Sequence, residues 1–142
     1  GSGDVHNLPG VPLPPMYQVR GNVDGDWSLP PVRTIWALDR KIMAAHGHHY
    51  LEGSTLRPFV IAAQREAACA FLFGHTHVPY CGDDGGVLLL NPGSLSRPRG
   101  RWGPSFAVID VPPEGSGWID VRMLSFLAAV PSCAFRPSIQ RE

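Results

Sequence analysis

The chain has 142 residues, and its 12 Lys and Arg side chains are balanced by 12 Asp and Glu side chains. This length fits one domain, and a net charge of zero gives no reason to expect binding to nucleic acid or to a membrane surface. Gly and Pro contribute 16 and 15 residues, whereas charged residues make up only 17% of the chain. The composition therefore indicates short strands joined by tight turns and argues against a helical bundle.

The cysteines are sparse and odd in number: Cys69, Cys81 and Cys133. They predict no disulfide framework, and a reducing compartment is the simpler interpretation. No signal peptide is visible at the start of the sequence, and no apolar run reaches the length that a membrane span requires. We therefore expect a cytoplasmic, soluble domain.

The predicted elements are mainly strands. After a loop over residues 1–15, runs of apolar and β-branched residues predict strands. In chain order these are 17–20, 34–38, 41–45, 70–73, 80–81, 87–90, 106–111 and 118–126. One helix is predicted, because apolar residues recur at three- and four-residue steps from a cap at Ser54 to about Ala68. Residues 82–86 are expected to form a hairpin turn.

We expect one domain over residues 1–127, followed by a C-terminal tail over 128–142 in which no periodicity is visible. Such a tail is either loose or docks on a partner. The sequence contains no internal repeat and no sign of a second domain.

The histidines gather directly after two of the predicted strands. His46, His48 and His49 follow strand 41–45, and His75 and His77 follow strand 70–73. In an open α/β sheet, ligands bind at the carboxyl ends of the strands, and imidazole is a good ligand for ions such as zinc, manganese and iron. The pattern therefore indicates a metal site, although residues 46–49 taken alone are equally consistent with a polar turn.

Five short segments in a fixed order carry a resemblance to a known family. They are Gly3-Asp4-Val5, Val19 to Asp24, Ala45 to His48, Phe73 to Pro79 and Asn91 to Ser94. Their order resembles the calcineurin-like metallophosphoesterases, specifically the small YfcE-type phosphodiesterases, from Gly3 to about Phe126. The resemblance implies a strand-rich α/β sandwich of two sheets with flanking helices, and metal ions at the loop ends.

The resemblance also implies a ligand set for two metal ions. Asp4 is similar to the carboxylate that bridges the ions in the family. Asn22, His46 and His75 would complete the ligands of the second metal, and His77 would bind the first. Manganese is the expected ion, with zinc, iron or nickel as alternatives.

One family motif is absent from this sequence. The family carries a D-x-H motif on its opening strand, upstream of the Gly-Asp motif, and this sequence has no such strand unless Asp4-Val5-His6 is itself that motif. We therefore expect a domain that lacks its first strand and helix, one well-held ion and a weak neighbouring metal position. Low activity is expected, which an upstream D-x-H segment would restore. The exposed sheet edge or apolar surface could then drive homo-oligomerisation.

The implied reaction is hydrolysis of small phosphodiesters through a metal-activated hydroxide. His48 is the candidate that protonates the leaving alkoxide, against a structural role. Asp24 is a candidate to orient Asn22, against a solvated turn carboxylate. Arg97 and Arg99 are candidates to hold a substrate phosphate, against surface charges on a loop rich in Pro and Gly.

Two other functions stay open. Some proteins of this fold are non-catalytic interaction scaffolds, as the retromer subunit is, and the incomplete acidic set favours that alternative. The second is a structural zinc site built from His46, His48, His75 and His77. Structural zinc usually prefers cysteine, and no Cys pair here has the C-x-x-C spacing, which argues against it.

Overall fold

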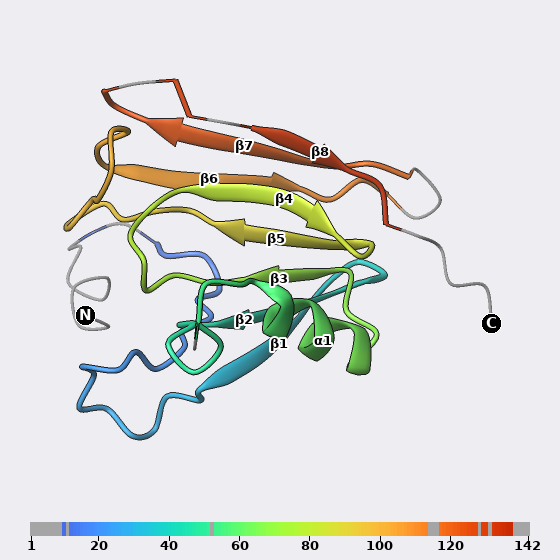
Figure 1. The fold of residues 1–142 in the computed structure, drawn as a ribbon, viewed down its shortest axis with the longest axis horizontal. Coiled ribbons are helices and arrows are strands. Elements are labelled where there is room, and N and C mark those ends of the chain that lie inside the picture. The colour runs from blue at the N-terminus through green and yellow to red at the C-terminus, as the bar shows by residue number, and fades with distance from the viewer. Residues whose placement is uncertain are drawn as a thin grey trace.

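The computed structural model describes Gly10 and residues 12–51, 53–113, 117–127, 129–130 and 132–137. These residues form eight strands and one helix in three layers (Figure 1). In chain order the elements are β1 Val32–Ala37, β2 Arg40–Ala45, α1 Arg57–Arg65, β3 Ala70–Leu72, β4 Tyr80–Asp84, β5 Val87–Asn91, β6 Ser105–Asp110, β7 Ile119–Ser125 and β8 Cys133–Phe135. The strand-rich α/β fold with two sheets is confirmed.

A five-stranded sheet forms the middle layer, with the strand order β1-β2-β3-β5-β4. The three inner strands β2, β3 and β5 are parallel, and β1 and β4 run antiparallel at the two edges. Every residue of β5 is buried, because both faces of the sheet are covered, as its continuous apolar sequence predicts. The carboxyl ends of the inner strands therefore meet at one edge of the sheet.

Alternate side chains of the inner strands belong to two separate cores. On one face, Met43, Phe71 and Leu89 pack with Phe59 of α1. Residues that point to the opposite face pack against the second sheet, which has the order β6-β7-β8. Figure 1 shows α1 and the β6-β7-β8 sheet on opposite sides of the molecule. The helix and the second sheet thus hold the central strands in place from both sides.

Both hairpins of the five-stranded sheet have tight turns. The β1–β2 turn contains Leu38 with φ 55°, and the β4–β5 turn contains Gly85 and Gly86 with φ 59° and 76°. These left-handed conformations suit glycine and are uncommon for leucine. The predicted hairpin over 80–90 is confirmed, with longer strands and a shorter turn than expected.

Two predicted elements near the start of the described chain differ from the structure. Residues 17–20 form no strand; instead, Arg20 N–H donates to Pro30 O over 2.9 Å and closes a loop. Helix α1 is shorter than expected, and its N-cap is Leu56 without a side-chain cap. Ser54 therefore does not cap the helix, and the N–H of Arg57 donates to Thr55 Oγ1 over 3.1 Å.

Residues 128–142 were expected to be a tail without regular structure, but Cys133–Phe135 forms β8 within this segment. The strand pairs antiparallel with β7, and Phe135 is buried in the core between the sheets. Three residues are too few to show a periodicity of two, so this strand is specified by its tertiary contacts rather than by a sequence pattern.

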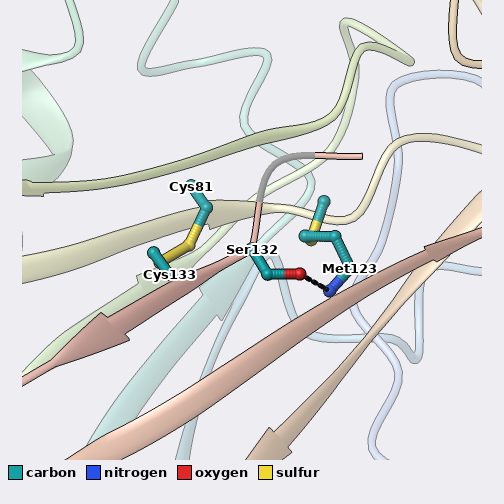
Figure 2. The surroundings of a disulfide bond; sticks show 4 residues. All are labelled: Cys81, Met123, Ser132 and Cys133. Carbon is teal, nitrogen blue, oxygen red and sulfur yellow. Dashed lines mark hydrogen bonds between the residues drawn. A yellow bond between two sulfur atoms is a disulfide. The ribbon is translucent and has the colours of Figure 1, made fainter. Parts of the chain in front are cut away.

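The prediction that the cysteines form no disulfide is wrong. Cys81 of β4 and Cys133 of β8 are joined by a disulfide across 52 positions of sequence. Figure 2 shows this bond beside Ser132, whose Oγ accepts a hydrogen bond of 3.0 Å from the N–H of Met123. Cys69 is free, and burial raises the pKa of its thiol. Because structural disulfides persist in oxidising compartments, the bond removes the argument for a reducing one.

Among the described residues each sheet ends in two edge strands, β1 and β4 in the larger sheet and β6 and β8 in the smaller one. No described strand pairs with the outer side of β1 or of β6, and Trp36 on β1 is 65% exposed. Self-association through an exposed sheet edge stays a prediction. None of the helices among the described residues is long and apolar enough to cross a membrane.

Candidate metal centre

The two histidine loops meet at the carboxyl edge of the central sheet. His46 follows the last residue of β2, and His75 lies three positions after the end of β3. Because β2 and β3 are parallel neighbours, their ends lie side by side, and the N–H of Gly74 donates to the carbonyl oxygen of His46 over 3.0 Å. The arrangement expected at the strand ends is thus what the backbone produces.

Three imidazoles form one cluster at this edge. The Nδ1 atoms of His46 and His48 are 3.0 Å apart and share a hydrogen bond. The ring centroid of His75 is 5.0 Å from that of His46 and 6.1 Å from that of His48. His49 continues the group on the outer side, with its ring 3.9 Å from that of His48. One nitrogen of each paired ring is therefore free to face a ligand.

The surroundings of the cluster disfavour protonation of His46 and His48. Burial lowers the pKa of His46, and positive charge on His75 and His48 lowers it further, while Asp24 opposes the shift. Burial also lowers the pKa of His48, with added effects of His49, His75 and Arg20. A neutral imidazole has the lone pair that a metal ion needs, so the electrostatics favour the ligand form of the rings.

These shifts predict that the fold is less stable in acid. The unfolded chain takes up protons on its histidines below their ordinary pKa of about 6.5, whereas folded His46 and His48 resist protonation. Stability is therefore full above that pH and falls as the pH drops toward the lowered folded pKa values. With a chelator present, the urea midpoint should be lower at about pH 5.5 than at about pH 7.5.

The control for this pH effect is a variant with both His46→Asn and His48→Asn. Its urea midpoint should change less between the same two pH values, because two of the responsible groups are gone. Equal pH dependence in the wild type and the variant would assign the effect to other groups and contradict the prediction.

The loop that carries Asn22 lies against the cluster. A Cβ atom on Gly21 would stand 3.1 Å from Asp24 Oδ2 and 3.2 Å from Cδ2 of His46, so a side chain here would press on both residues. The N–H of Gly21 donates to Asp24 Oδ2 over 2.8 Å. Asp24 thus holds the backbone next to Asn22, and its predicted role in orienting a metal ligand stays a prediction. Asn22 itself is exposed.

The His75–His77 loop adopts strained backbone conformations. His75 and His77 have φ values of 66° and 60°, a region that costs energy for residues other than glycine. The Nδ1 atom of His77 is buried and has no hydrogen-bond partner among the described residues. Strain and an unpartnered buried nitrogen at one place support a functional role for these histidines.

Asn91 holds this loop, a role that sequence reasoning missed. Its side chain is fully buried at the end of β5, and its Nδ2 donates to Gly74 O and to Thr76 Oγ1, both over 2.9 Å. Its Oδ1 accepts a hydrogen bond of 2.9 Å from the N–H of Gly93. The available signal was the polar Asn91 directly after an apolar strand, in the Asn-Pro-Gly-Ser segment.

Gly93 should not tolerate a side chain. Its φ is +83°, and an added Cβ would lie 2.1 Å from Ser105 Oγ, which donates to Pro92 O over 2.8 Å. We expect Gly93→Ala to lower the free energy of unfolding by about 2–4 kcal/mol, measured by urea denaturation. Gly25→Ala is the matched control, because nothing lies within 4 Å of a Cβ at that position. Equal losses in the two variants would contradict this account.

Arg97 and Arg99, the predicted phosphate-binding residues, are both exposed. Their backbone N–H groups bond to Ser94 Oγ over 3.0 Å and to His77 O over 3.0 Å. Neither lines the cavity next to the histidines, which Arg20 does. Their contact with substrate stays a prediction.

The described side chains supply only some of the ligands that a metal ion needs. No three His, Cys, Asp or Glu side chains in this portion of the chain are arranged to hold a metal ion. The alternative zinc site of four histidines is therefore not supported. Asp4, the predicted bridging ligand, lies outside the described residues, and the amide of Asn22 is a ligand of another type. The neutral imidazoles and the unpartnered nitrogen of His77 match the donor chemistry of a transition metal.

The sequence of this chain is similar to those of known phosphoesterases. A family model described as the calcineurin-like phosphoesterase superfamily domain matches residues 3–113. The protein named "Probable metallophosphoesterase YsnB" of Bacillus subtilis (strain 168) is 33% identical over 97 residues, which are 68% of this chain and 57% of that protein. A second protein with the name of a metallophosphoesterase, from Methanocaldococcus jannaschii, is 34% identical over 88 residues, or 61% and 45% of the two chains. The chain spans about half the length of these curated relatives.

Solved structures share the fold. A conserved protein of Streptococcus pneumoniae TIGR4, described as a predicted phosphoesterase, has a TM-score of 0.72 at 30% identity, covering 83% of this chain and 68% of that chain. Vps29 of Chaetomium thermophilum has a TM-score of 0.71 at 17% identity, covering 84% and 68%. The likeness to Vps29 concerns the fold alone.

Proposed function

We propose a function from one premise: this chain belongs to the calcineurin-like phosphoesterase superfamily. The proposed function is that of a metal-dependent phosphodiesterase that hydrolyses small phosphodiesters. The observation that supports it is the cluster of His46, His48 and His75 at the carboxyl edge of the sheet. The family generally binds divalent metal ions, and manganese is the ion we propose here.

The proposed ligands of the better-held ion are Asp4, Asn22, His46 and His75, with His77 at a weaker neighbouring position. When bound, the metal would supply Lewis-acid activation of water and of the phosphoryl group. The neighbouring residues give these ligands their positions. Asp24 holds the backbone before Asn22 through the N–H of Gly21, and Asn91 fixes the loop that carries His75 and His77.

His48 is the proposed proton donor to the departing alkoxide. Its Nδ1 is engaged with His46, which leaves Nε2 as the atom that would hold and transfer the proton. His48 lines the cavity beside the cluster, so a substrate bound there would lie within its reach. A cytoplasmic location stays a prediction, and the Cys81–Cys133 disulfide argues against it, since structural disulfides persist in oxidising compartments.

The direct test is metal titration of the purified chain, followed by a hydrolysis assay with bis(p-nitrophenyl) phosphate. We expect Mn²⁺ to bind, to raise the thermal unfolding midpoint and to be required for release of nitrophenol. A chain that binds Mn²⁺ or Zn²⁺ but hydrolyses no phosphate ester would contradict the catalytic function.

A second candidate is a non-catalytic interaction scaffold. The open β1 edge with exposed Trp36 favours it, as does the absence of a three-ligand group among the described side chains. The titration separates the two functions, because a scaffold would keep the same unfolding midpoint with and without Mn²⁺ and Zn²⁺.

A further inference from the structure

A cavity of about 340 Å³ opens beside the histidine cluster. This volume is at the lower end of the range for small-molecule pockets. One part of its wall is apolar and includes Pro31, Val32 and Ala45. The surface of the cavity is mostly apolar, and Arg20, His48 and His49 are also among its lining residues. The cavity therefore offers an apolar surface and a cation next to the proposed metal ligands.

Arg20 is the permanently charged side chain among the described residues that line the cavity. Arg20 carries a permanent positive charge, and none of the described lining residues is a carboxylate. The ion pairs that the described residues form are Arg40–Asp39, Lys41–Glu66 and Arg122–Asp110. Arg20 takes part in none of them. A half-buried cation that is not paired with a carboxylate attracts an anion to this cavity.

The cavity is built before any ligand enters. The guanidinium of Arg20 lies 4.6 Å from the ring centroid of Trp27, and its backbone N–H is tied to Pro30 O. Stacking on one face of the guanidinium leaves its edge N–H groups able to donate. Tyr50 also lines the cavity, and its ring stacks on that of Phe59 with the centroids 5.0 Å apart. Such preorganisation lowers the entropy cost of binding.

We propose that this cavity binds a phosphate ester of an aromatic or similarly apolar alcohol. Arg20 would donate hydrogen bonds to non-bridging phosphate oxygens, and the wall of Pro31 and Val32 would contact the apolar ester arm. This assignment rests on the proposed function, which it deepens by naming the substrate class and a substrate-binding residue. The cavity should therefore bind esters of apolar alcohols more tightly than it binds inorganic phosphate.

The test measures binding without metal, by calorimetry of the chain in EDTA with three probes: phenyl phosphate, inorganic phosphate and phenol. Phenyl phosphate should bind more tightly than either other probe, because it alone engages both Arg20 and the apolar wall. Arg20→Gln should weaken phenyl phosphate binding by about tenfold or more. Arg20→Lys should lie between wild type and Arg20→Gln, because it keeps the charge and loses the forked geometry.

Arg101→Gln is the matched control. Arg101 also packs on a tryptophan, at 5.0 Å from the ring of Trp102, but it does not line the cavity. This variant should bind phenyl phosphate as the wild type does. Thermal unfolding would verify that each variant is folded, and Arg20→Lys supplies the comparison if Arg20→Gln does not fold.

Equal binding of phenyl phosphate by the wild type, Arg20→Gln and Arg20→Lys would overturn the role of Arg20. Equal affinity for phenyl phosphate and inorganic phosphate would overturn the apolar subsite. Binding in EDTA without metal-dependent hydrolysis would contradict the proposed function alone. Metal-dependent hydrolysis without any effect of Arg20 would contradict this inference alone.

Discussion

Replacement of His46 by Asn is expected to lower the affinity for Mn²⁺ by about 100-fold or more. The imidazole of His46 contacts two parts of the proposed centre, the ring of His75 and Nδ1 of His48. Its removal would take away a ligand and the hydrogen bond that orients His48. Hydrolysis of a phosphodiester should fall at least in proportion to the lost metal occupancy.

The matched control for this variant is His49→Asn in the same loop. His49 is exposed and contacts the cluster only through His48, so the affinity for Mn²⁺ should stay close to that of the wild type. Calorimetric titration of the three proteins provides the measurement. Similar affinities in the wild type and His46→Asn would exclude His46 as a ligand and remove the basis of the proposed centre.

Removal of the Cys81–Cys133 disulfide is expected to lower the free energy of unfolding by about 4 kcal/mol in the chain-entropy model. The bond closes a loop across 52 positions, so its loss greatly enlarges the set of unfolded conformations. The disulfide also links β4 of one sheet to β8 of the other, so its removal takes away the covalent connection between these strands. Urea denaturation of a variant with Cys81→Ser and Cys133→Ser measures the loss.

Reductant provides a second measurement on the unmodified chain. Dithiothreitol should shift the urea midpoint of the wild type toward that of the double variant and leave the variant unchanged. Cys69→Ala is the control for removal of a thiol, since Cys69 is free and its variant should respond to reductant as the wild type does. A wild-type midpoint that is insensitive to reductant would show that the bond does not stabilise the fold.

The central sheet and the position of the histidines were predictable from local sequence. The apolar runs of β3 and β5 are buried on both faces of the sheet, and such burial leaves a continuous signal in the sequence. Because His46 and His75 follow strands that are parallel neighbours, their meeting at one edge follows from the sheet topology.

Other features depend on contacts between distant residues and carried no local signal. β8 and the Cys81–Cys133 pairing exist because the second sheet brings distant segments together. Residues 17–20 have the composition of a strand, but loop contacts such as that of Arg20 with Pro30 satisfy the backbone instead. The role of Asn91 as a clamp also becomes visible only once the loops are placed.

The tight turns at Leu38 and at Gly85-Gly86 stand where β2 and β5 begin, which is the end of the sheet opposite His46. The molecule thus offers two attachment points remote from its histidine-bearing loops. Either turn could carry a short epitope, a spectroscopic reporter or a surface anchor. Such a label would report on the protein during the titrations and would not contact the histidines. The β4–β5 turn is the better choice, because glycine there already adopts the left-handed backbone that an engineered junction can reuse.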